Sequence, residues 1–116
     1  MTAYAVAHLR TTSSHDDVIT YIELIQETMD PYGGRFLVHG PEVEVVEGEW
    51  PGTLVLLAFP DLDSAHDWYA SPAYRKILPL RTAHIAGDII LAEGVAPGYD
   101  ARQTAAAIRA AAEPES

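Results

Sequence analysis

The stretch TLVLLAF, residues 53–59, decides the fold of this 116-residue chain. Almost every side chain in it is apolar, whereas a strand with one face in water alternates apolar and polar residues. Both faces of this strand must therefore be covered by other parts of the protein. The pattern predicts a central strand of a β-sheet.

Three further segments have strand character. AYAVAHLR, residues 3–10, alternates so that Tyr4, Val6 and His8 share one face. RFLVHG, residues 35–40, is predicted to continue as a strand through EVEVVE, residues 42–47, after a bulge or bend at Gly40-Pro41. DIILAEGV, residues 88–95, is the last predicted strand.

A helix is expected between the first two strands. Ser14 is the predicted N-cap, and the acidic pair that follows suits the positive end of a helix. DPYGG, residues 30–34, ends the helix because the residue before a proline disfavours helical geometry and glycine accepts a positive φ. Spacings of four, three and four residues predict one buried stripe: Val18, Ile22, Ile25 and Met29.

A second helical region follows the central strand. It begins after a cap at Asp61 or Asp63 and restarts where Ser71 caps and Pro72 occupies the first helical position. Pro79 is expected to kink or divide it, because a proline within a helix removes a backbone hydrogen bond.

The element order is therefore βαββαβ, the α+β ferredoxin-like arrangement with a four-stranded antiparallel sheet. Helices cover one face, and the other face stays open in a single chain. A second copy packing sheet against sheet would cover it, which predicts a homodimer, a dimeric α+β barrel. Residues 1–96 form this domain, and the alanine-rich residues 97–116 form a C-terminal helix or a flexible tail.

Composition excludes several functions. The net charge is −10, with one lysine and six arginines, so neither nucleic-acid binding nor binding to anionic membranes is expected. The chain has no cysteine, which excludes disulfides and thiolate chemistry. It lacks a signal peptide and any apolar run near the roughly 20 residues that cross a bilayer, so we expect a cytoplasmic protein.

Several segments together resemble a known family. YGGRFLVHG (32–40), VEVVEGEW (43–50), LVLLAFPDLDSAHDWYASPAY (54–74) and LPLR (78–81) resemble the domain-of-unknown-function 1330 family (DUF1330), over about residues 3–95. That family belongs to the dimeric α+β barrel superfamily. The superfamily includes cofactor-independent monooxygenases, muconolactone isomerase, polyketide cyclases, chlorite dismutases and heme-degrading enzymes. The resemblance implies a small-ligand pocket between sheet and helices, without a settled reaction.

Three residues are candidates for acid–base catalysis. By strand alternation His39 shares a face with Leu37, and if that face is inward His39 lies at a cavity edge, where it could move a proton near pH 7. The alternative is a histidine bonded to the bend that follows it. Glu47 continues the strand period onto the valine face, where burial would raise its pKa, although it could instead bond the GEWPG turn. Tyr32, beside the glycine turn, could donate its phenol hydrogen to a ligand.

Six residues are candidates for substrate binding. Trp50, Trp68 and Tyr69 offer apolar walls, with Trp68 also expected in the ordinary core. Arg35 and Arg81 are the best anion clamps in a chain so poor in cations, although 17 acidic residues make structural salt bridges an easy alternative. His8 completes the set, and we expect it to approach the same cavity as His39.

No cofactor and no dedicated metal site are expected. The sequence contains no HxxxH or HxH pattern, and YGGR precedes a strand rather than the helix of a nucleotide loop. By superfamily analogy alone, heme binding would need a histidine facing a large pocket, with His66 or His84 as candidates.

Two functions remain open. The first is a small enzyme that acts on an aromatic, polyketide-like or acidic molecule by cofactor-independent acid–base chemistry. It requires His8, Tyr32, Arg35, His39 and Glu47 to converge on one cavity. The second is a non-catalytic homodimeric module that binds a ligand or a protein, because no stringent catalytic signature is present.

Overall fold

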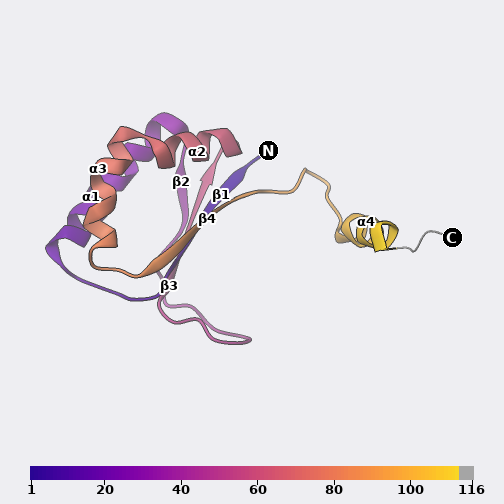
Figure 1. The fold of residues 1–116 in the computed structure, drawn as a ribbon, viewed down its shortest axis with the longest axis horizontal. Coiled ribbons are helices and arrows are strands. Elements are labelled where there is room, and N and C mark those ends of the chain that lie inside the picture. Colours follow the sequence, from indigo (N-terminus) through magenta and orange to yellow (C-terminus); the bar gives the residue numbers. More distant parts are fainter. Residues whose placement is uncertain (113–116) are drawn as a thin grey trace.

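A computed structural model describes residues 1–112 of the chain. Three helices cover one face of a four-stranded antiparallel sheet, in which the strands lie in the order β2-β3-β1-β4 (Figure 1). This is the predicted ferredoxin-like topology, with the TLVLLAF strand inside the sheet. The elements are β1 Ala3–Leu9, α1 Asp16–Met29, the 3-10 turn η1 Asp30–Tyr32, β2 Arg35–His39, β3 Thr53–Phe59, α2 Leu62–Ala70, α3 Pro72–Thr82, β4 Gly87–Glu93 and α4 Ala101–Ala112.

The core lies between the helices and one face of the sheet. β1 presents Ala3, Ala5 and Ala7 to the helices, and its small side chains leave room for large aromatic ones. The largest fully buried side chains are Trp68, Tyr74, Phe59 and Met29. Within residues 1–112 no helix has the length and apolar character needed to cross a membrane.

The opposite sheet face is open and largely apolar. β1 presents Val6 there, beside its register partners Leu56 on β3 and Ile90 on β4. Ile90 keeps 57% of its surface exposed, and Val6 and Leu56 are only half-buried. The face of β3 that the helices do not cover therefore still meets solvent in the single chain.

The predicted strand over residues 42–47 is wrong. β2 ends at His39, and residues 40–52 form a long loop that includes Gly40 and Gly52 at positive φ. A continued β2 would have to pair with the segment before β3, where Pro51 and Gly52 provide no regular strand. The bulge lies earlier than expected, at Leu37, between the paired residues Phe36 and Val38.

Three helix details also differ from expectation. His15, not Ser14, caps α1, its Nδ1 accepting from the Asp17 N–H at 3.0 Å. Tyr21 is buried in place of Ile22, which is 47% exposed. α3 runs undivided through Pro79, and the Pro79 side chain is exposed to solvent.

Ser71 joins two helices and offers a stability test. Its hydroxyl donates to the Trp68 carbonyl of α2 at 2.7 Å and accepts from the Tyr74 N–H of α3 at 3.3 Å. We expect Ser71→Ala to lower the free energy of unfolding by about 1–2 kcal/mol, because the buried Tyr74 N–H at the start of α3 loses its side-chain cap, whereas the Trp68 carbonyl keeps the backbone N–H of residue 71. Urea unfolding measures this. The exposed Ser14→Ala is the control, and equal losses in both variants would contradict the assignment of the caps.

Candidate functional site

A cavity of about 430 Å³ lies between the sheet and helices α1 and α3. The alanines of β1 create it, because side chains this short do not reach the helices that cross above them. Apolar groups form most of its wall: Ala5, Ala7, Leu9, Val18, Ile22, Ile25, Phe36, Val55, Leu57, Trp68, Ile85 and Ile89. The volume suits a small organic molecule.

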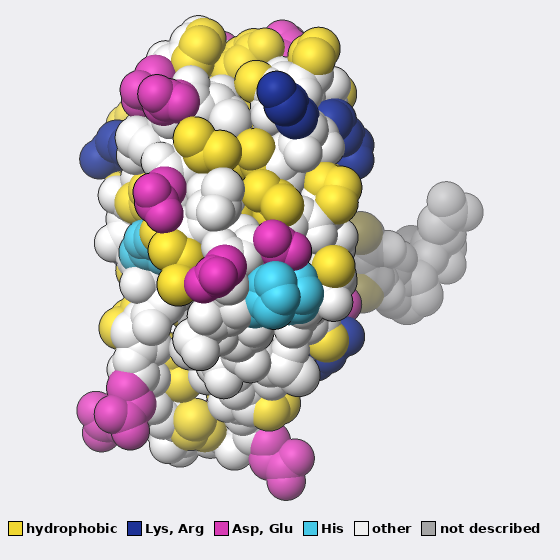
Figure 2. All heavy atoms as spheres, turned by 90° about the vertical axis from the view of Figure 1, so that its left-hand side faces the viewer, with side chains coloured by type: hydrophobic (Ala, Val, Ile, Leu, Met, Phe, Trp, Pro, Cys, Tyr) yellow, Lys and Arg dark blue, Asp and Glu magenta, His cyan; other side chains and the backbone are white. Residues whose placement is uncertain are grey.

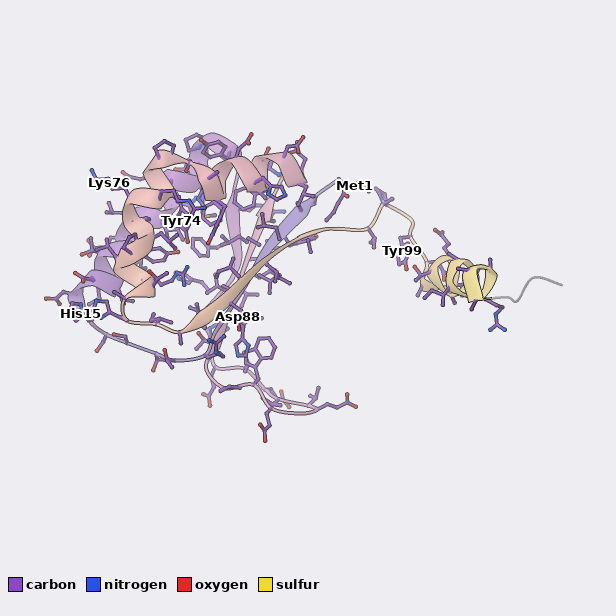
Figure 3. All side chains as sticks on the ribbon, viewed as in Figure 1. Met1, His15, Tyr74, Lys76, Asp88 and Tyr99 are labelled. Atoms are coloured by element: carbon purple, nitrogen blue, oxygen red, sulfur yellow. The ribbon has the colours of Figure 1, made fainter. Side chains whose placement is uncertain are left out.

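A cationic group is built into this apolar wall. Arg81, in the last turn of α3, lines the cavity although only 5% of its surface is exposed. Its guanidinium carbon lies 5.6 Å from the ring centroid of Tyr21 on α1, and the Tyr21 and Tyr74 hydroxyls are joined at 2.8 Å. Figure 3 shows Tyr74 between the helices and the sheet. The carboxyl end of α3 also favours a positive charge here.

The charges of this group follow from its surroundings. Burial, reinforced by Tyr74, raises the pKa of the Tyr21 phenol far above its ordinary value, so Tyr21 is neutral at physiological pH. Burial opposes the charge of Arg81, but the adjacent Tyr21 and Tyr74 more than offset this effect and hold the pKa of Arg81 above its usual value. Tyr21 thus offers its hydroxyl to the cation but no negative charge.

Arg81 has no carboxylate partner among residues 1–112. The salt-bridge interpretation is therefore wrong for Arg81, although exposed arginines do pair, Arg10 with Asp88 and Arg102 with Asp100. The Nε–H of Arg81 is buried without any hydrogen-bond acceptor. A buried donor left unpaired costs free energy, and a group that supplied the missing acceptor would be bound strongly.

His39 also lines the cavity, but for a different reason than strand alternation suggests. The bulge at Leu37 reverses the alternation, so His39 shares the helix-facing side with Phe36 rather than with Leu37. Its ring stacks on Phe36 with centroids 4.3 Å apart. The expected cavity-edge position is therefore reached through a bulge that the sequence pattern does not reveal.

The expected convergence of five residues on one cavity is wrong within the chain, because only His39 lines the cavity. Glu47 is exposed in the loop, so its predicted burial fails with the strand that was meant to carry it. His8 lies on the open sheet face, where it contacts the Pro51 carbonyl at 2.6 Å and stacks on Trp50. Arg35 is exposed at the edge of the sheet.

The remaining predicted residues are aromatic. Trp68 lines the cavity and is anchored by its Nε1–H, which donates to Thr28 Oγ1 at 3.0 Å. Tyr69 and Tyr32 pack against the core outside the cavity wall, and Trp50 stays with His8 on the other side of the sheet. Sequence reasoning missed Tyr21 and Tyr74 as neighbours of Arg81; Tyr21 could have been found, because it lies three residues after Val18 and four before Ile25, on the buried side of α1.

One group of histidine and carboxylate has metal-ligand chemistry. His84 Nε2 lies 3.0 Å from Asp17 Oδ2. His15 stacks on His84, with the ring centroids 3.8 Å apart. Figure 2, which views the molecule from the left-hand side of Figure 1, shows histidine beside acidic groups. The rings are nearly parallel, so their lone pairs do not converge on one point, and His15 Nδ1 already caps α1. The arrangement is that of a helix cap beside a histidine–carboxylate hydrogen bond. Neither His84 nor His66 lines the cavity, as heme binding would require.

The burial of Tyr21 predicts how stability changes at high pH. Its folded-state pKa lies above its unfolded value of about 10, so its contribution to stability is full below pH 10 and is lost as the pH rises further. Tyr21→Phe should therefore lose stability less steeply above pH 10, by up to about 1.4 kcal/mol per pH unit. Urea unfolding at pH 8 and pH 11 measures the difference, and the pH 8 data separate the lost hydrogen bond. If the free energy of unfolding falls equally between pH 8 and pH 11 in both proteins, the result would contradict the burial of the Tyr21 phenol.

Solved structures with this fold span most of the chain. The RPA0582 protein of unknown function from Rhodopseudomonas palustris is 13% identical, with a TM-score of 0.64 over 83% of this chain and 84% of that one. A dimeric ferredoxin-like protein of unknown function from Jannaschia sp. CCS1 is 11% identical, with a TM-score of 0.63 over 81% and 100%. SnoaB, a cofactor-independent oxygenase from Streptomyces nogalater, is 10% identical, with a TM-score of 0.52 over 85% and 96%.

These likenesses establish the fold but not an activity. No functionally curated protein matches the sequence. Residues 2–95, which contain the whole sheet, the cavity and Arg81, match a domain of unknown function, DUF1330. The chain therefore belongs to the DUF1330 family.

Proposed function

We propose that this protein binds a small, largely apolar organic carboxylate in the cavity, with the carboxylate on Arg81. The observation that carries the proposal is a buried guanidinium with an unpaired Nε–H in a chain whose net charge is −10. Residues 1–112 contain 15 Asp and Glu side chains, and none of them pairs with this cation. A ligand carboxylate would supply both the charge and the acceptor that Arg81 lacks.

The rest of the cavity fits the apolar body of such a ligand. The wall opposite the helices is the row of small alanines on β1, and aromatic rings flank it. Flat or aromatic acids suit this shape because they present two apolar faces and one charged end. The Tyr21–Tyr74 hydroxyl pair lies beside Arg81, within reach of the same charged end.

His39 is the group that would exchange a proton with the ligand. It is the histidine that lines the cavity, and an imidazole can both donate and accept a proton. Cofactor-independent acid–base chemistry on a bound acid would use it as donor or acceptor. The alternative function is a ligand-binding module without turnover. His39→Gln separates the two, because an enzyme would keep ligand binding and lose turnover, whereas a binding module has no turnover to lose.

The protein is further proposed to be a homodimer through the open sheet face. Solved structures of this fold include proteins described as dimeric and ferredoxin-like. In this chain the corresponding face carries Val6, Leu56 and Ile90, which a second sheet would shield from water.

Replacing Arg81 tests the carboxylate site. Arg81→Met should weaken the binding of benzoate or a larger aromatic carboxylate by at least about tenfold, because a charge-assisted hydrogen bond is lost. Binding of the neutral amide of the same acid should be unchanged. Isothermal titration calorimetry measures both. Arg35→Met is the matched control, since Arg35 is exposed and lies outside the cavity.

The same variant tests the cost of the buried charge. Arg81→Met should raise the free energy of unfolding of the ligand-free protein by about 1–3 kcal/mol, because an apolar side chain of similar length removes a buried Nε–H that has no acceptor. Urea unfolding without ligand measures this. A destabilised variant would mean that Arg81 is retained for the fold, and tight carboxylate binding by Arg81→Met would contradict the proposed site.

A charge on the open face tests the dimer. Ile90→Asp should raise the dissociation constant of the dimer at least about tenfold, because a buried carboxylate would lack a partner in the sheet-to-sheet interface. Sedimentation velocity over a range of concentrations measures it. Ile19→Asp is the control, because Ile19 is comparably exposed on α1, on the other side of the molecule. A wild-type chain that stays monomeric throughout would contradict the dimer.

A further inference from the structure

The C-terminal segment does not pack on its own chain. Residues 94–100 leave the end of β4 and lead to α4, in which every residue is exposed (Figure 1). The radius of gyration is 17.5 Å, whereas a compact chain of this length has about 13 Å. A helix of 12 residues that buries none of its side chains is marginal in water even when it is rich in alanine. A partner surface would stabilise it.

The direction of this segment points to a partner on the open sheet face. Helices α1, α2 and α3 cover one side of the sheet, and α4 projects from the opposite side (Figure 1). The loop of residues 40–52 also extends on that side, from the other end of the sheet. Tyr99 lies just before α4, well away from the body of the protein (Figure 3). A protein seated on the open face would lie between these two extensions.

The surface of α4 is adapted to an apolar and acidic partner. One stripe of the helix is apolar at spacings of four, three and four: Ala101, Ala105, Ile108 and Ala112. Ile108 is 63% exposed, and Arg102 and Arg109, seven residues apart, border the stripe on one side. Small alanines allow a helix to approach another surface closely.

The charge of the rest of this chain is complementary to α4. Residues 1–100 contain 15 carboxylates and five lysines and arginines, a formal charge of −10. Ala101–Ala112 contains two arginines and no carboxylate, although Arg102 pairs with Asp100 in its own chain. A second copy of this protein thus presents the acidic surface that a cationic helix would select.

We propose that residues 94–112 form an arm that packs α4 onto a second copy of this chain. The apolar stripe of α4 faces the second copy. By two-fold symmetry, α4 of the second copy makes the same contact with the first. This inference rests on the proposed homodimer, and it adds a contact that lies beyond residues 2–95, the part of the chain that matches the family. The arm stabilises the dimer and becomes an ordered helix by packing on the partner.

Hydrogen–deuterium exchange on the full-length protein tests the arm directly. In the dimer, amides of residues 101–112 should exchange at least about tenfold more slowly than in the monomeric Ile90→Asp variant, because only packing on a partner protects so short a helix. Trypsin provides a second readout, since cleavage after Arg102 and Arg109 should be slowed in the dimer and fast in that variant.

Two alanine substitutions show which side of α4 makes the contact. Ala105 lies in the apolar stripe and Ala107 lies on the opposite side of the helix, and both are exposed. Ala105→Asp should raise the dimer dissociation constant at least about fivefold and remove the protection of the arm. Ala107→Asp, with the same intrinsic effect on helix formation, should leave both unchanged.

The outcomes separate the arm from the dimer. If the full-length protein is dimeric but the amides of residues 101–112 exchange at the same rate as in Ile90→Asp, the proposed packing of α4 is wrong, whereas the proposed dimer is supported. If Ala105→Asp and Ala107→Asp act equally on the dissociation constant, the assigned stripe is wrong. If the wild-type protein is monomeric at every concentration, the proposed dimer fails and the arm fails with it.

Discussion

A cation held inside an apolar cavity is the constraint on which the account of this protein depends. Arg81 lines the cavity, lies almost wholly out of solvent, and has no carboxylate partner within the part of the chain that the structure describes. Charges are placed in such surroundings at a cost in stability. Tyr21 and Tyr74 offset the effect of burial on the charge, but the Arg81 Nε–H still has no acceptor, which a ligand in the cavity can supply.

The cavity and the open sheet face both follow from the pattern of β1. Its helix-facing side is made of alanines, which leaves space above the sheet, whereas its other side carries larger groups such as Tyr4 and Val6. One short strand thereby forms the floor of a pocket and part of a surface suited to another chain. Packing on one side of the sheet and the proposed association on the other therefore both depend on the same seven residues.

Sequence patterns predicted the architecture well and the site only in part. An apolar run such as TLVLLAF constrains topology because both of its faces need cover, and that reasoning does not depend on side-chain detail. The position of His39 depended on a bulge at Leu37, which alternation cannot show. The predicted burial of Glu47 was wrong because Gly40 and Pro51 interrupt the strand pairing that would have buried this side chain. The surroundings of Arg81 were not predictable either, because Tyr21 comes from another helix, α1, and the many acidic residues suggested a salt bridge.

The most direct test of the central claim observes the Arg81 Nε–H itself. In a ¹H–¹⁵N spectrum of the arginine side chains, assigned with Arg81→Lys, we predict that the Arg81 Nε–H resonance shifts downfield and saturates as benzoate is added. The resonance of exposed Arg35 should not move, and benzamide should leave Arg81 unchanged. If the Arg81 Nε–H chemical shift does not change with benzoate or larger aromatic carboxylates, or changes equally with the neutral amides, the result would contradict a carboxylate site at Arg81.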